Sequence, residues 1–244
     1  MSEAQSVDLA NRPFDPRLIC ALDVPTTDEA RALVERIGDA VGFYKVGLQL
    51  FASDGMSLAR ELKAAGAQVF LDWKLHDIGA TVEKATAVLA NAGCDLLTVH
   101  ARSQVMAAAA RGAAGSDLKI LGVTVLTSLT EEDLKADDHS LSAADLVELR
   151  VRQALEAGVH GVVSSPHEAA RVREIALAAG REDFLIVTPG VRPTGAALDD
   201  QARAATPASA LEAGATHLVV GRPITASVDP RAAAQAITAE IALI

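Results

Sequence analysis

The sequence predicts a single (β/α)8 barrel of the TIM type, and three observations support this α/β fold class. The chain has 244 residues, and about 250 is typical of such barrels. A phrase recurs along it, in which an Ala-rich helical stretch, an Ala-Gly pair and a β-branched run follow one another, as in LKAAGAQVFLDWKL. Strands and helices therefore alternate, which implies parallel strands joined by right-handed crossovers.

Eight short runs rich in Val, Ile and Leu are expected to form the strands. They cover residues 18–24, 43–48, 68–75, 95–101, 119–126, 161–165, 184–190 and 217–224. The glycines expected to end helices in a left-handed conformation are Gly66, Gly93, Gly158, Gly180 and Gly214. A doubly wound open sheet is the alternative, but such sheets normally have fewer strands, and no G-x-G-x-x-G follows the first run.

The composition restricts where the protein can be located in the cell and what it can bind. A formal net charge of −10 argues against binding to nucleic-acid polymers or anionic membranes, because phosphates would be repelled. No apolar run reaches the roughly 18 residues of a membrane span, and the N-terminus lacks the layout of a signal peptide. Cys20 and Cys94 are expected to be buried, reduced thiols. We therefore expect a cytoplasmic protein with a polar extension over residues 1–16 and one barrel domain over residues 17–244.

One predicted strand carries charges where apolar residues are expected. The stretch FLDWKLHDIGATV includes Asp72, Lys74 and Asp77. Because side chains alternate between the two faces of a strand, Leu71 and Trp73 would pack under the helices, whereas Asp72 and Lys74 would point into the barrel mouth. A buried ion pair is weak evidence of stability, because desolvation of each ion is costly. The pattern therefore favours a functional site over a structural salt bridge.

Polar side chains also lie within, at the end of or directly after other predicted strands. They are Asp23, Lys45, His100, Thr127 and Ser128. The carboxyl ends of all the strands meet at one face of a barrel, which is where enzymes of this fold place their active sites. We therefore expect these residues to share a site with the charged strand.

The last two units predict a phosphate site. Gly221 and Arg222 end the eighth run, and the long Gly-containing loop after the seventh run carries Arg192 and Gln201. The loops after strands seven and eight are the usual phosphate site of these barrels. Glycine lets backbone N–H groups approach an anion, and arginine offers a planar fork of donors.

The motifs ALDV, YKVGL, FLDWKLHDI-x-x-T, VLTS, TPGVRP and VVGRPIT together resemble the orotidine 5′-phosphate decarboxylase family, and the likeness covers nearly the whole chain. The resemblance implies a homodimer that decarboxylates orotidine 5′-phosphate to UMP and CO2, the last step of UMP biosynthesis, without a cofactor or a metal. It implies that Lys74 is the catalytic proton donor, beside Asp72 and Lys45. Asp77 would cross the dimer interface and complete the charge array of the neighbouring subunit.

The same resemblance implies the contacts to the rest of the substrate. Asp23 and Lys45 would contact the ribose, and Asp23 also the base. Thr127 and Ser128 would contact the pyrimidine ring, and Thr81 would reach the ligand of the neighbouring subunit. The phosphate and its closing loop would be held by Arg192, Gln201, Gly221 and Arg222.

The chemistry explains why such a reaction needs these groups. Loss of CO2 leaves negative charge on C6 of the pyrimidine, an sp² carbon without an electron sink. An ammonium at C6, here Lys74, stabilises that charge more strongly as it develops and can then protonate it. Asp72 is expected near the departing carboxylate, where repulsion is relieved as neutral CO2 leaves. Phosphate binding would order residues 190–201 and so turn remote binding energy into catalysis.

Two segments carry narrower expectations. Where the family usually has Asp-Ile-Pro-Asn-Thr, this chain has Asp-Ile-Gly-Ala-Thr, so Gly79 is expected to give a looser connection than proline would. The acidic stretch EEDLKADD, residues 131–138, is expected to form a solvated loop.

Two other functions are compatible with a charged barrel mouth. A metal-dependent sugar-phosphate aldolase or decarboxylase on the same barrel would also carry D-x-K-x-x-D and use the acids to hold Mg²⁺. Such relatives tend to have an acid in the second strand, whereas this chain has Lys45. A non-catalytic sensor of phosphorylated metabolites is the other alternative, but a sensor would not need a desolvated array of charges.

Overall fold

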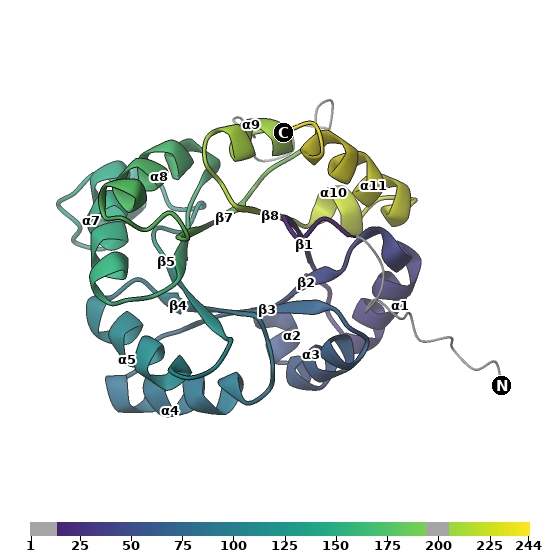
Figure 1. The fold of residues 1–244 in the computed structure, drawn as a ribbon, viewed down its shortest axis with the longest axis horizontal. Helices are drawn as coiled ribbons and strands as arrows, with labels where there is room; N and C mark the ends of the chain where they lie inside the picture. Colours follow the sequence, from purple (N-terminus) through teal and green to yellow (C-terminus); the bar gives the residue numbers. More distant parts are fainter. Residues whose placement is uncertain (1–13, 194–204) are drawn as a thin grey trace.

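The computed structural model describes residues 14–193 and 205–244, and its strands form one closed barrel (Figure 1). In chain order and in order around the barrel they are β1 Leu18–Ala21, β2 Phe43–Gly47, β3 Gln68–Leu75, β4 Leu96–His100, β5 Lys119–Val123, β6 Gly161–Val163, β7 Leu185–Pro189 and β8 His217–Val220. All neighbouring strands are parallel, and β8 pairs with β1 to close the ring. The predicted (β/α)8 barrel is confirmed.

Helices surround the barrel on its outer side (Figure 1). The longer ones are α1 Thr27–Ile37, α3 Gly55–Ala64, α4 Gly79–Ala90, α5 Ser103–Ala113, α7 Ala143–Glu156, α8 Ala169–Ala178 and α11 Pro230–Ile241. Shorter helical segments are α2 Leu48–Phe51, α6 Glu131–Ala136, α9 Pro207–Glu212, α10 Arg222–Thr225, η1 Gly38–Ala40 and η2 Pro166–Glu168. Among the described residues, every helix is too short or too polar to span a bilayer.

The helix ends follow the local chemistry of the sequence. Side-chain oxygens accept a backbone N–H at the first turn of several helices, from Thr26, Thr130, Ser142, Thr206 and Asp229. The five glycines expected to end helices all have positive φ, between 71° and 105°. A side chain is disfavoured in that conformation, which is why glycine marks these helix ends in the sequence.

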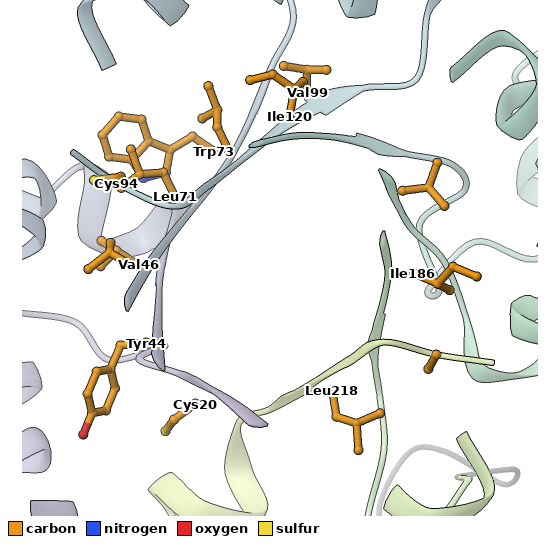
Figure 2. Packing of buried hydrophobic residues seen from close by; sticks show 14 of the residues in the cluster. Cys20, Tyr44, Val46, Leu71, Trp73, Cys94, Val99, Ile120, Ile186 and Leu218 are labelled. Atoms are coloured by element: carbon orange, nitrogen blue, oxygen red, sulfur yellow. The ribbon is translucent and has the colours of Figure 1, made fainter. Parts of the chain in front are cut away.

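Two apolar layers follow from the alternation of side chains along each strand. Ile19, Phe43, Phe70 and Leu121 belong to a compact cluster that fills the barrel interior. The intervening residues pack against the helices, and Figure 2 shows such side chains, Trp73 among them, on the outer face of the barrel wall. The inner layer fills the barrel below its carboxyl-terminal mouth.

Several predicted boundaries were too long at their carboxyl ends. The run 217–224 was wrong at its end, because β8 stops at Val220 and α10 begins at Arg222, with Pro223 in its first turn. The expected loop at 131–138 was also wrong in part. Glu131–Ala136 form α6, because Thr130 and Asp133 make a reciprocal capping box at its start.

Both cysteines are unpaired and buried, as expected. Burial in apolar surroundings raises the pKa of Cys20 to about 12 and that of Cys94 to about 11. At neutral pH these thiols therefore stay protonated and unreactive, which is the behaviour of structural cysteines.

Candidate active site

A cavity of about 340 Å³ opens at the carboxyl ends of the strands. Its wall combines apolar residues of the barrel with charged residues from the ends of several strands and from the loops after β7 and β8. The charged residues are Asp23, Lys45, Asp72, Lys74, Arg192 and Arg222. Enzymes of this fold place their sites at the same end of the barrel. The structure therefore brings together the six charged residues named above, all of which the sequence singled out.

Four of these side chains form a row of alternating charge, from Asp23 just after β1, across Lys45 of β2, to Asp72 and Lys74 of β3. Lys45 Nζ donates a hydrogen bond to Asp23 Oδ1 at 2.8 Å and lies 3.4 Å from Asp72 Oδ2. Lys74 Nζ donates to the other oxygen of Asp72, Oδ1, at 2.8 Å. The formal charges cancel within the row, and Asp72 is shared by both ammonium groups.

The inner members of the row are largely removed from solvent. The side chains of Lys45 and Asp72 are 9% and 15% exposed. Burial opposes the charge on Lys45, but the attraction of Asp72 and Asp23 outweighs it and raises the pKa of this ammonium. Burial likewise opposes the charge on Asp72, yet Lys45 and Lys74 hold the pKa of its carboxyl below the ordinary value. Both residues are therefore ionised at neutral pH, in surroundings where Coulomb interactions are strong.

The backbone of Lys74 departs from regular strand geometry. Its φ is +50°, and the pairing of β3 with β4 slips between Leu71 and Leu75. The Lys74 N–H donates to the side-chain hydroxyl of Thr98 at 3.0 Å, and that hydroxyl lies 2.9 Å from Asp72 Oδ1. A β-bulge of this kind redirects a side chain and is typical next to active sites.

Thr98 is a site residue that the sequence interpretation missed. It lies in β4, two residues before His100 and two after Leu96, whose side chain belongs to the barrel interior. A signal was present, because a threonine on the inward face of an otherwise apolar strand needs a polar partner there. The alternation that identified Asp72 and Lys74 would have identified Thr98 if applied to the next strand.

Two arginines line the cavity at the end where the sequence predicts a phosphate site. Arg222 is exposed and lines the cavity with Gly221, and within residues 14–193 and 205–244 its guanidinium makes no hydrogen bond or ion pair. Arg192 also lines the cavity, and its backbone N–H donates to the carbonyl of Ala205 at 3.0 Å. Gln201 lies outside the described residues. Arg222 is thus a cation available to an anionic ligand at the mouth.

The two residues expected at the pyrimidine ring differ in position. Thr127 lines the cavity, whereas Ser128, the next residue, does not. Both are exposed in the loop after β5. A contact between Ser128 and the ring therefore stays a prediction.

Asp77 and Thr81 do not line the cavity of their own chain. Both are exposed, Asp77 just before α4 and Thr81 in its first turn. Asp77 Oδ1 accepts the Ile78 N–H at 2.6 Å, and the part of the chain that the structure describes supplies no ion-pair partner for this carboxylate. The described residues of a single chain thus leave Asp77 without a cation, and its role across an interface stays a prediction.

His76 and His100 lie beside the charged row but outside the cavity lining. Their ring centroids are 5.2 Å apart. Burial lowers the pKa of His100, and the nearby His76 and Lys74 lower it further. His100 is therefore neutral at neutral pH and leaves the net charge of the mouth unchanged.

Comparisons with known proteins agree with this geometry. The model of the family described as "Orotidine 5′-phosphate decarboxylase / HUMPS family" matches residues 16–237. The orotidine 5′-phosphate decarboxylase of Caulobacter vibrioides is 67% identical over 228 residues, which cover 93% of this chain and 98% of that protein. The enzyme of the same name from Cereibacter sphaeroides is 56% identical over 231 residues, covering 93% and 97%.

A solved structure extends the likeness to three dimensions. The crystal structure of orotidine 5′-phosphate decarboxylase from Lactobacillus acidophilus superposes with a TM-score of 0.81 at 36% identity, and covers 93% of this chain and 99% of that one. Sequence, fold and the charged barrel mouth therefore lead to one assignment. The chain belongs to the orotidine 5′-phosphate decarboxylase / HUMPS family.

Proposed function

We infer that this protein catalyses the decarboxylation of orotidine 5′-phosphate to UMP and CO2, the last step of de novo UMP biosynthesis. Family membership and 67% identity to a protein named for this reaction support the inference. The single observation that carries it is the contact of both Asp72 oxygens with lysine ammonium groups, at 2.8 Å from Lys74 and 3.4 Å from Lys45.

The two ends of the cavity suit the two ends of this substrate. Arg222 offers a guanidinium that can hold a phosphate through two parallel hydrogen bonds. Lys74 and Asp72 lie in the carboxyl-terminal half of β3, where the base would enter the barrel mouth. Binding energy from the phosphate would then hold the base against the charged row, although the phosphate takes no part in the bond that breaks.

We propose that Lys74 provides the proton that replaces CO2. The C6–carboxylate bond breaks, its electron pair stays on C6, and CO2 leaves as a neutral molecule. The ammonium of Lys74 stabilises this pair electrostatically and transfers one proton to C6, and the resulting amine regains a proton from solvent. The step needs no electron acceptor, so we propose that the enzyme works without a cofactor.

Asp72 and Lys45 hold the proton donor in place. Asp72 accepts the hydrogen bond of Lys74 and would face the substrate carboxylate, so that loss of CO2 relieves a repulsion between two anions. Lys45 balances the charge of Asp72 and is in turn fixed by Asp23. Such a preorganised array costs no rearrangement when the reaction occurs.

We also propose that the active unit is a homodimer in which Asp77 and Thr81 enter the partner's site. Three large apolar residues in the elements around the charged strand are exposed, namely Ile78, which directly follows Asp77, at 71%, and Leu48 and Phe51 of α2 at 60% and 54%. The Phe51 ring packs on Trp73 of β3 at 4.7 Å between centroids, so α2 lies beside the charged strand. A second copy of the chain would bury these side chains and bring Asp77 to a lysine pair.

The metal-dependent alternative conflicts with the surroundings of Asp72. A divalent cation on this carboxylate would lie beside two ammonium groups that already contact its two oxygens. Like charges at such distances in a buried site repel strongly. The sensor alternative leaves unexplained why two lysines and an aspartate are held together at the cost of desolvation.

A cytoplasmic location is part of the proposal. The two cysteines are buried and unpaired, as is usual for proteins of reducing compartments.

The assay follows the change in ultraviolet absorbance as orotidine 5′-phosphate is consumed. We expect turnover by the native chain, with or without EDTA, and a loss of at least about 10³-fold in Lys74→Ala, because the proton donor is removed. Lys135→Ala, which removes an exposed lysine of α6, is the matched control and should keep full activity. Absence of turnover by the native chain would refute the proposal, and loss of activity in EDTA would favour the metal-dependent alternative.

A further inference from the structure

We propose that Thr98 is a positioning residue for the proton donor, and that its hydroxyl holds both the backbone of Lys74 and the carboxylate of Asp72. The inference rests on the proposed function and deepens it. Thr98 Oγ1 accepts the Lys74 N–H at 3.0 Å and lies 2.9 Å from Asp72 Oδ1. Since Lys74 Nζ also donates to that oxygen, the three residues close a ring of hydrogen bonds.

The direction of each bond follows from the donor inventory. A threonine hydroxyl has one hydrogen to donate and can accept through its lone pairs. Because Lys74 N–H can only donate, the hydroxyl accepts there and keeps its own hydrogen for another group. The two acceptors in reach are Asp72 Oδ1 at 2.9 Å and the Leu71 carbonyl at 3.5 Å. The carboxylate is closer and charged, so the hydroxyl donates to Asp72.

The irregular backbone of β3 explains why such a group is needed. Leu71 pairs with Leu97 and Leu75 with Val99, so residues 72–74 all lie opposite Thr98. The extra residues take the Lys74 N–H out of the regular ladder, and a buried N–H without an acceptor is strongly disfavoured. The side chain of Thr98 supplies that acceptor from within a fully buried position, with 0% of the residue exposed.

The conformation of Lys74 depends on the same contact. A φ of +50° is unfavourable for lysine and persists only where the surroundings fix it. Without the hydroxyl, β3 could regain a regular pairing with β4, in which Lys74 would have a negative φ and its side chain another direction. The hydroxyl therefore determines where the ammonium lies relative to a bound base.

Two substitutions separate the hydroxyl from the shape of the side chain. Thr98→Val keeps the shape and removes the hydroxyl, and Thr98→Ser keeps the hydroxyl and removes a methyl group. Thr188→Val is the matched control, because Thr188 is a fully buried threonine of β7 whose hydroxyl has no hydrogen-bond partner among the described residues. All are compared with the native chain in steady-state assays with orotidine 5′-phosphate.

We expect Thr98→Val to lower kcat about 100-fold with less than a threefold change in KM, because a misplacement of about 1 Å can cost that much. Thr98→Ser and Thr188→Val should stay within about threefold of the native kcat. The acidic limb of the kcat–pH profile should move to higher pH in Thr98→Val alone, since the Thr98 hydrogen bond helps to lower the pKa of Asp72. A purely structural role would not move this limb.

The inference is overturned if Thr98→Val keeps kcat within threefold of the native value, or if Thr98→Ser loses as much as Thr98→Val. Should Thr98→Val fail to fold, Thr98→Cys, which fills similar space with a weak hydrogen-bonding group, carries the same expected loss. If the native chain does not consume orotidine 5′-phosphate, the proposed function fails by itself. The crystal structure of the variant then decides: an unchanged Lys74 φ and an unchanged Nζ–Asp72 contact would overturn the inference.

Discussion

A Cβ atom on Gly47 would lie 2.8 Å from Oδ1 of Asp23, and 2.9 Å from Nζ of Lys45. Carbon atoms do not approach polar atoms that closely without a shift, so the missing side chain at the end of β2 makes room for the Asp23–Lys45 ion pair. Gly47 is therefore part of the site, although it has no functional group. Its φ of −86° is accessible to any residue, so the space and not the backbone requires glycine here.

Gly47→Ala should therefore disturb the ion pair while leaving the fold intact. We expect kcat/KM for orotidine 5′-phosphate to fall at least about tenfold, because Lys45 would move away from Asp72. Gly79→Ala is the control, since a Cβ there meets Ala108 at an ordinary 3.7 Å. Native kcat/KM in Gly47→Ala, with circular dichroism unchanged, would show that the ion pair tolerates the methyl group.

The proposed sharing of each site between two subunits predicts complementation between two inactive proteins. Lys74→Ala and Asp77→Ala are mixed under conditions that exchange subunits, and each hybrid dimer then holds one intact and one doubly defective site. When equal amounts exchange at random, half of the dimers are hybrids, and one of the two sites in each hybrid is intact. About one quarter of the native activity should therefore return. A mixture of Lys74→Ala with the Lys74→Ala/Asp77→Ala double variant is the control and should stay inactive. Failure of the first mixture to recover would remove the role of Asp77 across the interface.

Gly79→Pro should stabilise the protein. Gly79 is the first residue of α4, where proline is favoured because its fixed φ suits the helix start. The preceding Ile78 has ψ 146°, which is compatible with a following proline. The free energy of unfolding in urea should rise by about 0.4–1 kcal/mol, because the unfolded chain loses freedom. An unfolding free energy below that of the native chain would mean that proline does not fit this turn.

His217 should make the protein less stable in weak acid. Burial lowers the pKa of its imidazole to about 4, Lys119 lowers it further, and Asp15 partly opposes this. In the unfolded chain the imidazole has the ordinary pKa of about 6.5. Between pH 6.5 and 4 the unfolded state therefore binds more protons than the folded state, and the free energy of unfolding decreases as the pH is lowered. The loss should be on the order of 3 kcal/mol over this range. His217→Gln should show a flatter dependence in urea titrations, and an equal slope in both proteins would contradict the buried, neutral imidazole.

The fold could be predicted because each strand is an apolar run with its own helix and glycine signal. The carboxyl ends of the strands were predicted less accurately, because the apolar runs continue beyond the last residue of each strand, as at the buried Val125 after β5. The helix at Glu131–Ala136 was missed, although Thr130 and Asp133 carry its capping box. Acidic composition outweighed that local signal.

The charged row could be predicted from alternation along single strands, but its support could not. The positive φ of Lys74 cannot be predicted from the residue type or from its neighbours in the sequence, because it depends on the hydrogen bond to Thr98 in the next strand. The space at Gly47 depends on the contact between Lys45 of the same strand and Asp23, which follows β1. Contacts of this kind exist only once the barrel has closed.

The central claim is that the Lys74 ammonium meets the carbon that loses CO2. The most direct measurement is a crystal structure with a uridine 5′-phosphate analogue that carries an anionic oxygen at C6, in place of the departing carboxylate. The account predicts Lys74 Nζ within about 3 Å of that oxygen, as in a charge-assisted hydrogen bond. A Lys74 side chain turned away from C6, with another group in that place, would contradict it.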